Sequence, residues 1–263
     1  MLKSLFHWVL RKWTKRRLRG KELWFFYGIR RSGNHACINW VANAHVRKSV
    51  QHKQLGFGIF FEYGDQQVFF INSFAQVPPV ELALNLWRYR AVWNACPTIF
   101  LSREDTPNDT GHFMDVPHLA THVIGITRSM PNVLASRLKK YQEEIVKPDG
   151  GIAGVFVVNS NILQQFFEAR NAPKIWHYDE WLNDPAWRRR FLDELGLGPD
   201  LMPGMSIQGG GSSFGQESGA KTARHALVPC PEAVKVVVNP LLDRLPEEEQ
   251  VVMRHWMEGN EIN

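Results

Sequence analysis

Cysteine is scarce in this sequence, and the few that occur are not paired along the chain. Cys37, Cys96 and Cys230 are odd in number and widely separated, which excludes the disulfide framework of a small secreted domain. The sequence also has no His-Glu-x-x-His motif and no Cys-x-x-Cys pair, so we predict no catalytic metal. Free thiols suit a reducing compartment, and the expected location is the cytoplasm.

Long apolar runs are absent from the N-terminal segment. The short apolar stretch 5–10 is followed by a basic cluster that extends to Lys21. This stretch is too short to span a bilayer, and its charges follow the apolar part, whereas in a signal peptide they precede it. Two interpretations stay open for residues 1–21: a basic amphipathic helix in peripheral contact with an anionic membrane, or a solvated arm. Residues 22–263 are predicted to form a single domain.

The Gly-x-x-x-x-Gly-Lys-Ser/Thr motif of nucleotide triphosphatases is a further absence. Residues 24–36 nevertheless have the pattern of a buried strand, a basic glycine turn and a helix start. The backbone N–H groups and the helix dipole of such a turn attract an anion. The plain alternative is a structural turn with arginines on a solvated rim. The residues expected to contact the anion are Arg30, Arg31, Ser32, Gly33, Asn34 and His35.

A second apolar strand also ends in an arginine. It ends at Arg128, after which Ser129 is a candidate N-cap and Pro131 suits the first turn of a helix. Ser136 follows eight positions after Arg128, so a guanidinium and a hydroxyl are offered to one phosphate. Taken alone, Arg128 could instead end a strand and pair with a carboxylate.

These two segments together resemble the sulfotransferases that use 3′-phosphoadenosine 5′-phosphosulfate (PAPS). Arg31-Ser32-Gly33-Asn34-His35 is similar to the 5′-phosphosulfate loop of that family, although Asn34 and His35 stand where many members carry threonines. The resemblance implies that Arg128 and Ser136 hold the 3′-phosphate. It also implies a nucleotide-binding fold of the P-loop type, with PAPS as co-substrate.

A third resemblance lies at residues 177–185. Tyr178 precedes Pro185 by seven positions, matching the family tyrosine that lies against the adenine. Asp184 and Pro185 are also a sound N-cap and first-turn residue, and Gly196 is placed to end that helix. Part of this match is therefore ordinary helix capping. The alternative role for Tyr178 is that of an aromatic side chain packed in the core.

The general base is expected at the end of the apolar segment 98–101, which lies between the two predicted nucleotide loops in the sequence. Family members with a histidine base carry it in this part of the chain, whereas this sequence offers Glu104 and Asp105, with Glu104 favoured for its reach. Arg31 is the candidate for stabilising the leaving phosphate. A solvated acidic loop is the alternative for both carboxylates, and a histidine base is not excluded.

The stretch 209–221 is the most glycine-dense part of the chain and is expected to be a mobile loop. Sulfotransferases close a C-terminal loop over the nucleotide, and this stretch is similar in position but lacks their Arg-Lys-Gly element. Ser212 and Ser213 are its candidate contacts to the 3′-phosphate or adenine. A flexible linker with no ligand is the alternative.

The alternation of apolar strands and amphipathic helices predicts an α/β fold of three layers around a mostly parallel central sheet. The segment 59–74, with Gly64-Asp65 between two apolar runs, predicts either a hairpin or an insertion on the acceptor side. The predicted strands lie near 23–29, 67–73, 98–102, 122–127 and 173–178. The predicted helices lie near 34–49, 80–95, 130–142, 160–169, 185–195 and 245–258.

The net charge of +5 and the pI of about 9.2 suit a protein that binds a polyanionic nucleotide, but they are too small to indicate nucleic acid. The expected function is sulfuryl transfer from PAPS to an acceptor hydroxyl, on a carbohydrate or glycolipid by family association. The alternatives are a P-loop kinase-like phosphotransferase and a non-catalytic protein that binds anions or a membrane surface. The sequence does not indicate the oligomeric state.

Overall fold

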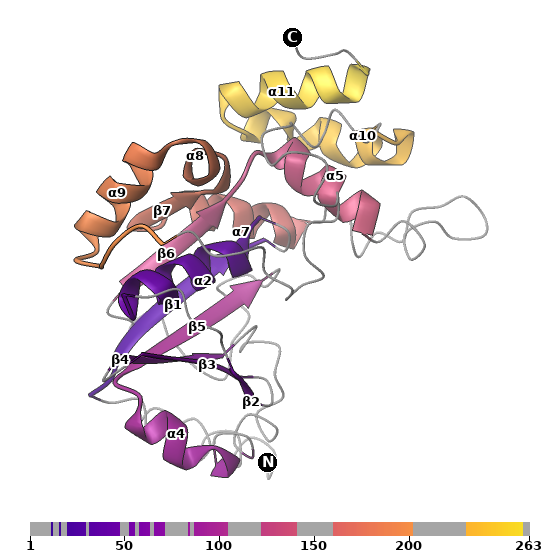
Figure 1. Cartoon of the computed structure of the whole chain (residues 1–263). Helices are drawn as coiled ribbons and strands as arrows, with labels where there is room; N and C mark the ends of the chain where they lie inside the picture. Colours follow the sequence, from indigo (N-terminus) through magenta and orange to yellow (C-terminus); the bar gives the residue numbers. More distant parts are fainter. Residues whose placement is uncertain are drawn as a thin grey trace, which may run out of the picture.

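A computed structural model of the chain gives the fold, which is drawn in Figure 1. The residues that the structure describes are 12, 16, 20–29, 32–47, 53–55, 58–63, 66–71, 84, 87–104, 122–140, 160–201 and 230–259. Among them no helix is long and apolar enough to cross a membrane. Most of the predicted N-terminal arm, residues 1–21, lies outside the described residues.

The centre of the fold is a seven-stranded sheet in the order β2-β3-β4-β5-β1-β6-β7. Its five strands from β4 to β7 run parallel, and β2 and β3 join its β4 edge as antiparallel strands. The predicted α/β class with a mostly parallel sheet is therefore confirmed. The strands are β1 (Glu22–Gly28), β2 (Lys53–Leu55), β3 (Gly58–Tyr63), β4 (Gln66–Ile71), β5 (Thr98–Glu104), β6 (His122–Thr127) and β7 (Lys174–His177).

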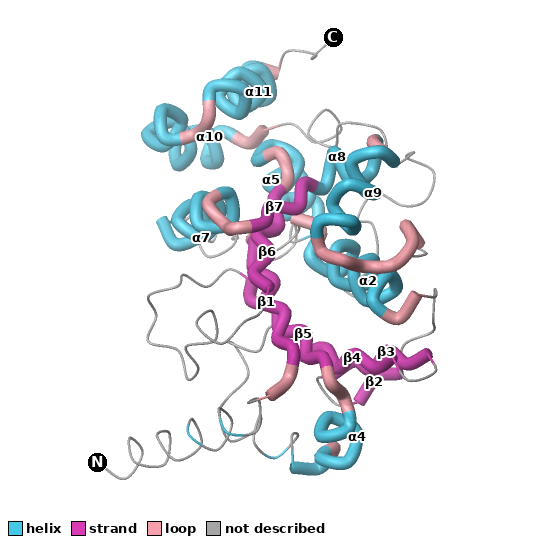
Figure 2. The backbone as a smooth tube through the Cα atoms, turned by 90° about the vertical axis from the view of Figure 1, so that its left-hand side faces the viewer, coloured by secondary structure: helices cyan, strands magenta, loops and turns pink. Residues whose placement is uncertain are grey.

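Helices cover both faces of the parallel part, as Figure 2 shows. On one face α2, α8 and α9 pack together, and α7 lies on the other face. The helices are α2 (Asn34–His45), α4 (Arg90–Ala95), α5 (Met130–Lys140), α7 (Ser160–Arg170), α8 (Tyr178–Asn183), α9 (Pro185–Glu194), α10 (Glu232–Val238) and α11 (Glu247–Glu258), with the 3₁₀ helix η3 (Asn239–Arg244).

The central strand β1 is buried on both faces because its side chains alternate between two layers. Trp24 and Phe26 belong to one hydrophobic cluster with α2, α8 and α9. Tyr27 points the other way, and its hydroxyl donates a 2.9 Å hydrogen bond to the carbonyl of Glu168 on α7. A second cluster joins Ile29 to side chains from α5, α7, α10 and α11. The strand end that carries the predicted anion loop is thus fixed between two cores.

Several predicted boundaries are wrong. The helix predicted over 34–49 ends at His45, because Arg47 adopts a left-handed φ of 57° and Gly198 N–H bonds the Ala44 carbonyl at 3.2 Å. The helix predicted over 80–95 is not continuous, since Tyr89 is a non-helical turn residue that precedes α4. The strand predicted over 173–178 ends at His177, and Tyr178 begins α8.

The hairpin prediction is confirmed, because β3 pairs antiparallel with β4 and Tyr63 lies opposite Gln66 across the turn. The caps predicted for α9 are also confirmed. Asp184 accepts hydrogen bonds from Ala186 N–H and Trp187 N–H, and Gly196, with φ of 66°, follows the helix end. Four elements were not predicted: β2, α8, α10 and η3.

Candidate functional site

The candidate site lies where the parallel strands β5, β1, β6 and β7 end at one edge of the sheet. Gly28 is in register with Glu104 on one side and Ile126 on the other, and Thr127 is in register with His177. Along the chain, the next parallel strand after β1 is β4, which lies on the β5 side of β1. The later strands β6 and β7 lie on the other side of β1. Such a divergence at the carboxyl ends is where open α/β sheets bind their ligands.

The turn after β1 is built by short local hydrogen bonds. Ser32 is fully buried, and both its N–H and its hydroxyl donate to the Ile29 carbonyl, at 3.2 and 2.7 Å. Gly33 then adopts φ 103° and ψ 19° as the N-cap of α2 and has no side chain to bond the helix amides. The positive end of the α2 dipole thus lies beside β1 with no side-chain cap.

Asn34 connects this turn to the candidate base. Its Nδ2 donates to Glu104 Oε1 at 2.6 Å and to the Ile29 carbonyl at 3.4 Å, and its Oδ1 accepts from the Ser32 hydroxyl at 3.2 Å. Asn34 and Glu104 are both buried. The structure therefore brings the predicted anion loop and the predicted base into direct contact, with the Asn34 amide fixing one oxygen of the carboxylate.

Tyr178 contacts both predicted nucleotide loops. A Cβ added to Gly33 would lie 2.3 Å from Cδ2 of Tyr178, so the ring lies directly against the glycine. The Arg128 guanidinium lies over the same ring, with its Cζ 4.4 Å from the ring centroid. Trp176 and Trp181 also contact the ring, with centroids 5.9 and 5.7 Å from that of Tyr178. The turn after β1 and the end of β6 therefore meet around one aromatic ring.

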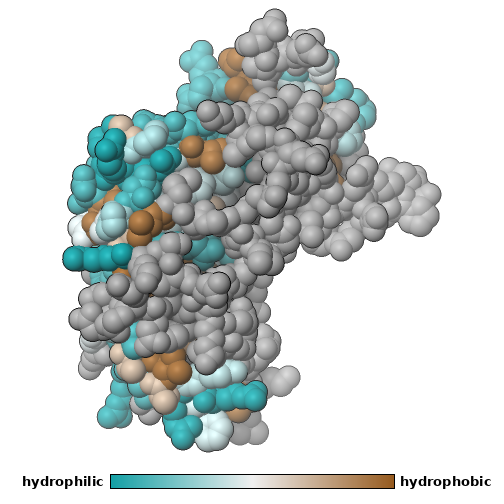
Figure 3. All heavy atoms as spheres, viewed as in Figure 1, coloured by the Kyte–Doolittle hydropathy of each residue, from teal (hydrophilic) through white to brown (hydrophobic). Residues whose placement is uncertain are grey.

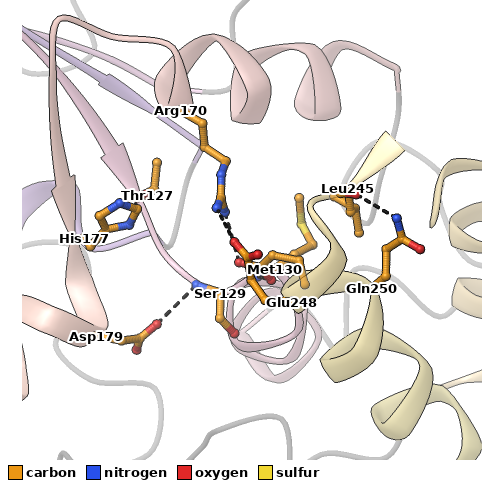
Figure 4. Close-up of polar contacts among 10 residues, drawn as sticks. Thr127, Ser129, Met130, Arg170, His177, Asp179, Leu245, Glu248 and Gln250 are labelled. Atoms are coloured by element: carbon orange, nitrogen blue, oxygen red, sulfur yellow. Dashed lines mark hydrogen bonds and ion pairs between the residues drawn. The ribbon is translucent and has the colours of Figure 1, made fainter. Parts of the chain in front are cut away.

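Asp179 fixes the segment that follows β6, and Figure 4 shows its contact with Ser129. One carboxylate oxygen lies 3.9 Å from Arg128 Nε, and the other accepts the Ser129 N–H at 3.2 Å. The prediction that the Ser129 side chain caps α5 is wrong, because its buried Oγ has no hydrogen-bond partner. Instead, Met130 N–H, in the first turn of α5, donates to Glu249 of α11 at 2.9 Å. A side chain from a distant helix thus replaces the local cap.

Figure 4 also draws Thr127 and His177 at the ends of β6 and β7, and Arg170 of α7 with its acidic partners on α11. Thr127 Oγ1 lies 2.6 Å from His177 Nδ1, and burial lowers the pKa of His177 while Glu180 opposes that shift. Arg170 on α7 donates to Glu249 at 3.2 Å and to Glu248 at 3.2 Å. Burial raises the pKa of Glu249, although its bonds to Met130 and Arg170 act against that rise.

The other predicted site residues are spread over several places. Ser136 is buried on α5, seven residues into the helix that follows Arg128. His35 is on α2, and its ring lies edge-on to Phe70 of β4, with centroids 6.4 Å apart. The residues that lie outside the described part of the chain are Arg30, Arg31, Asp105, Ser212 and Ser213.

Sequence reasoning missed Asp179 and Glu249, the two carboxylates that fix the Arg128 segment. Asp179 directly follows Tyr178, the predicted adenine contact, but it lies 51 positions after Arg128, and no local pattern pairs the two residues. Glu249 is 119 residues away from Met130, and no local pattern marks such a partner. Within the described residues no group of His, Cys, Asp and Glu has the arrangement of a metal site.

Comparisons with protein-family models, curated proteins and solved structures found no significant match to this chain. Its function is therefore inferred from its own residues and their geometry.

Proposed function

We propose that this protein transfers a sulfuryl group from PAPS to an acceptor hydroxyl. The proposal combines the family resemblance of three segments with their position in the fold. All three lie at the carboxyl edge of a parallel sheet, beside the point where the chain diverges, which is the general location of nucleotide sites in open α/β sheets. By the same resemblance, the nucleotide-binding fold is of the P-loop type.

The observation that carries the proposal is the shared contact of Tyr178. Its ring lies against Gly33 after β1 and under Arg128 after β6, so the two loops that resemble the 5′- and 3′-phosphate sites are neighbours. A nucleotide with phosphates at both ends requires such a pair of loops. An anion-binding turn alone would require only the first.

The roles of the residues follow from their positions. Arg128 and Ser136 hold the 3′-phosphate, and Tyr178 lies against the adenine. The turn 32–34 and the N-terminus of α2 face the 5′-phosphosulfate, and the family resemblance adds Arg30 and Arg31, which lie outside the described residues. Two of these side chains, Arg128 and Ser136, are at most 5 % exposed, so they are held in place before the nucleotide arrives.

The reaction is an in-line displacement at sulfur. The acceptor oxygen forms a bond to sulfur while the bond from sulfur to the bridging phosphate oxygen breaks, and the electron pair of that bond leaves with adenosine 3′,5′-bisphosphate. Glu104 takes the proton of the acceptor hydroxyl, and the Asn34 amide holds the carboxylate in position. Arg31 stabilises the charge that develops on the leaving phosphate. A carbohydrate or glycolipid hydroxyl is the acceptor class that the resemblance favours.

Calorimetric titration tests the donor site. The wild-type protein is expected to bind adenosine 3′,5′-bisphosphate at least about tenfold more tightly than adenosine 5′-phosphate, about 1.4 kcal/mol. Arg128→Lys and Ser136→Ala should each reduce that preference, because the first removes the bidentate guanidinium and the second the hydroxyl. Arg189→Ala, an exposed arginine on α9, is the matched control. Equal affinity for the two nucleotides in the wild-type protein would refute the donor assignment.

Turnover tests the reaction itself. With PAPS and a panel of hydroxyl acceptors, Glu104→Gln is expected to lower kcat by about 10²- to 10⁴-fold. Donor affinity should change little, because glutamine still offers an oxygen to Asn34 Nδ2. Glu22→Gln, at the opposite end of β1, is the control. Binding without turnover by the wild-type protein would indicate an anion-binding protein, and Mg²⁺-dependent phosphoryl transfer from ATP would indicate a kinase-like enzyme.

A further inference from the structure

An exposed surface that combines apolar and basic side chains lies at the end of the sheet opposite the candidate site. It includes the helical residues Leu84, Trp87 and Arg88 and the first residue of α4, Arg90. Leu84 and Trp87 are 60 % and 61 % exposed, the two most exposed large apolar side chains of residues 12–104 that the structure describes. We call this group the α4 surface.

Three members of the α4 surface precede the break at Tyr89, and Arg90 follows it as the first residue of α4. Trp87 and Arg88 follow Leu84 by three and four residues, the spacings that put helical side chains next to one another. The Arg90 guanidinium lies over the Trp87 ring, 5.2 Å from its centroid, and donates to the Trp87 carbonyl at 3.3 Å. An aromatic ring with an aliphatic neighbour and two exposed cations is the composition found at membrane interfaces.

The segment that carries the α4 surface is basic. The sequence contains no Asp or Glu from Leu82 to Arg103. Lys21, the last residue of the basic cluster 11–21 in the sequence, donates from Nζ to the carbonyls of Asn94 and Cys96 at the end of α4, at 3.0 and 2.5 Å. Lys21 and the α4 surface therefore lie at the same end of the molecule, and a negatively charged partner complements both.

We propose that the α4 surface docks on an anionic lipid bilayer, with Trp87 and Leu84 entering the interface and Arg88 and Arg90 contacting the headgroups. In Figure 3, brown and teal atoms lie side by side over the α4 region at the lower end of the view. α4 precedes the amino end of β5, whereas Glu104 is at the carboxyl end of that strand. Docking therefore leaves the candidate site at the far end of the sheet from the bilayer, as Figure 1 shows for α4 and β6.

Vesicle co-sedimentation of the full chain tests this docking. The protein is expected to bind vesicles of 70 % phosphatidylcholine and 30 % phosphatidylserine and not pure phosphatidylcholine vesicles. Arg88→Gln with Arg90→Gln should weaken binding by roughly tenfold or more, since each basic residue near such a surface contributes about fivefold. Arg189→Gln with Arg190→Gln, two exposed arginines on α9, is the matched control and should bind as the wild type.

A second measurement separates insertion at α4 from binding through residues 11–21 alone. Tryptophan fluorescence is quenched by brominated lipids only where an indole enters the bilayer. In a chain that carries Trp8→Phe and Trp13→Phe, Trp87→Phe should therefore keep most of the binding and lose most of the quenching. Leu84→Ser should weaken vesicle binding and leave thermal unfolding unchanged. Val251, an exposed valine on α11, gives the control Val251→Ser, which should not weaken vesicle binding. Unchanged binding by the double glutamine variant, unchanged quenching in Trp87→Phe, or self-association through this surface would overturn the proposal.

Discussion

Gly33 is subject to two independent constraints. Its φ of 103° lies in the region that side-chain-bearing residues rarely adopt, and the Tyr178 ring occupies the place that a Cβ would need. Either constraint alone favours glycine. Together they make Gly33 the residue that sets the spacing between the turn after β1 and Tyr178.

Gly33→Ala is therefore expected to lower the free energy of unfolding by roughly 3 kcal/mol or more, from backbone strain and from the displaced ring. Gly196→Ala is the matched control, because Gly196 has φ of 66° but no atom within 4 Å of an added Cβ. That variant should lose only about 1–2 kcal/mol. Chemical denaturation of both variants measures the difference, and equal losses would show that the ring contact contributes nothing.

Single residues of the site were predictable from the sequence where one local pattern marks them. Gly33 follows from the strand and turn pattern, and Arg128 from its position after an apolar strand. The contact of Tyr178 with both could not be predicted, since it joins residues that are 145 and 50 positions apart. Asn34 illustrates the limit best. Its amide was expected to face the anion, whereas in the structure it donates to Glu104.

The elements that position the site were predictable to different degrees. All five parallel strands were placed within a few residues, because buried strands are continuous apolar runs bounded by turns. α10 was missed, since its sequence Glu-Ala-Val-Lys-Val-Val-Val is rich in valine, which favours strands. Burial of Val234 and Val238 against the second cluster overrides that local preference.

The start of α5 depends on α11 through one carboxylate. Glu249 accepts the Met130 N–H and pairs with Arg170, and its pKa is raised because it is buried. A raised pKa means that the folded state binds a proton more tightly than the unfolded state. The favourable contribution is thus present at acid pH and is lost as the pH rises through the folded-state pKa.

Glu249→Gln is consequently expected to keep the bond to Met130 and to leave the free energy of unfolding at pH 8 unchanged or higher. Arg170 retains Glu248 as a partner in that variant. Glu249→Ala should lose about 1–3 kcal/mol, because the buried Met130 N–H then has no acceptor. Urea unfolding of both variants measures this, and a loss in Glu249→Gln as large as in the alanine variant would contradict it.

At the scale of the whole molecule, two half-buried histidines lie at opposite ends of the sheet. His45 contacts Thr98 near the amino ends at 3.1 Å, and His177 contacts Thr127 at the carboxyl ends at 2.6 Å. Burial lowers the pKa of both, although Glu22 opposes the shift at His45 and Glu180 at His177. A lowered pKa in the folded state means that the unfolded state binds the proton more tightly.

The contribution of these histidines to stability should therefore be complete above about pH 6.5 and should be lost as the pH falls through their folded-state pKa values. Each histidine contributes a slope of at most about 1.4 kcal/mol per pH unit. Urea unfolding between pH 8 and pH 5 should show a shallower pH dependence in His45→Gln with His177→Asn than in the wild-type protein. Identical slopes would show that neither ring titrates differently on folding.

The Tyr178 ring has a consequence for how changes in the two loops combine. A side chain added at position 33 displaces the Tyr178 ring, and a shorter side chain at position 128 removes the guanidinium over it, so the second change begins from an altered neighbour. Free energies of paired substitutions at positions 33 and 128 should not sum, whereas those of distant pairs do. The turn after β1 and the end of β6 thus behave as one thermodynamic unit joined through a single side chain.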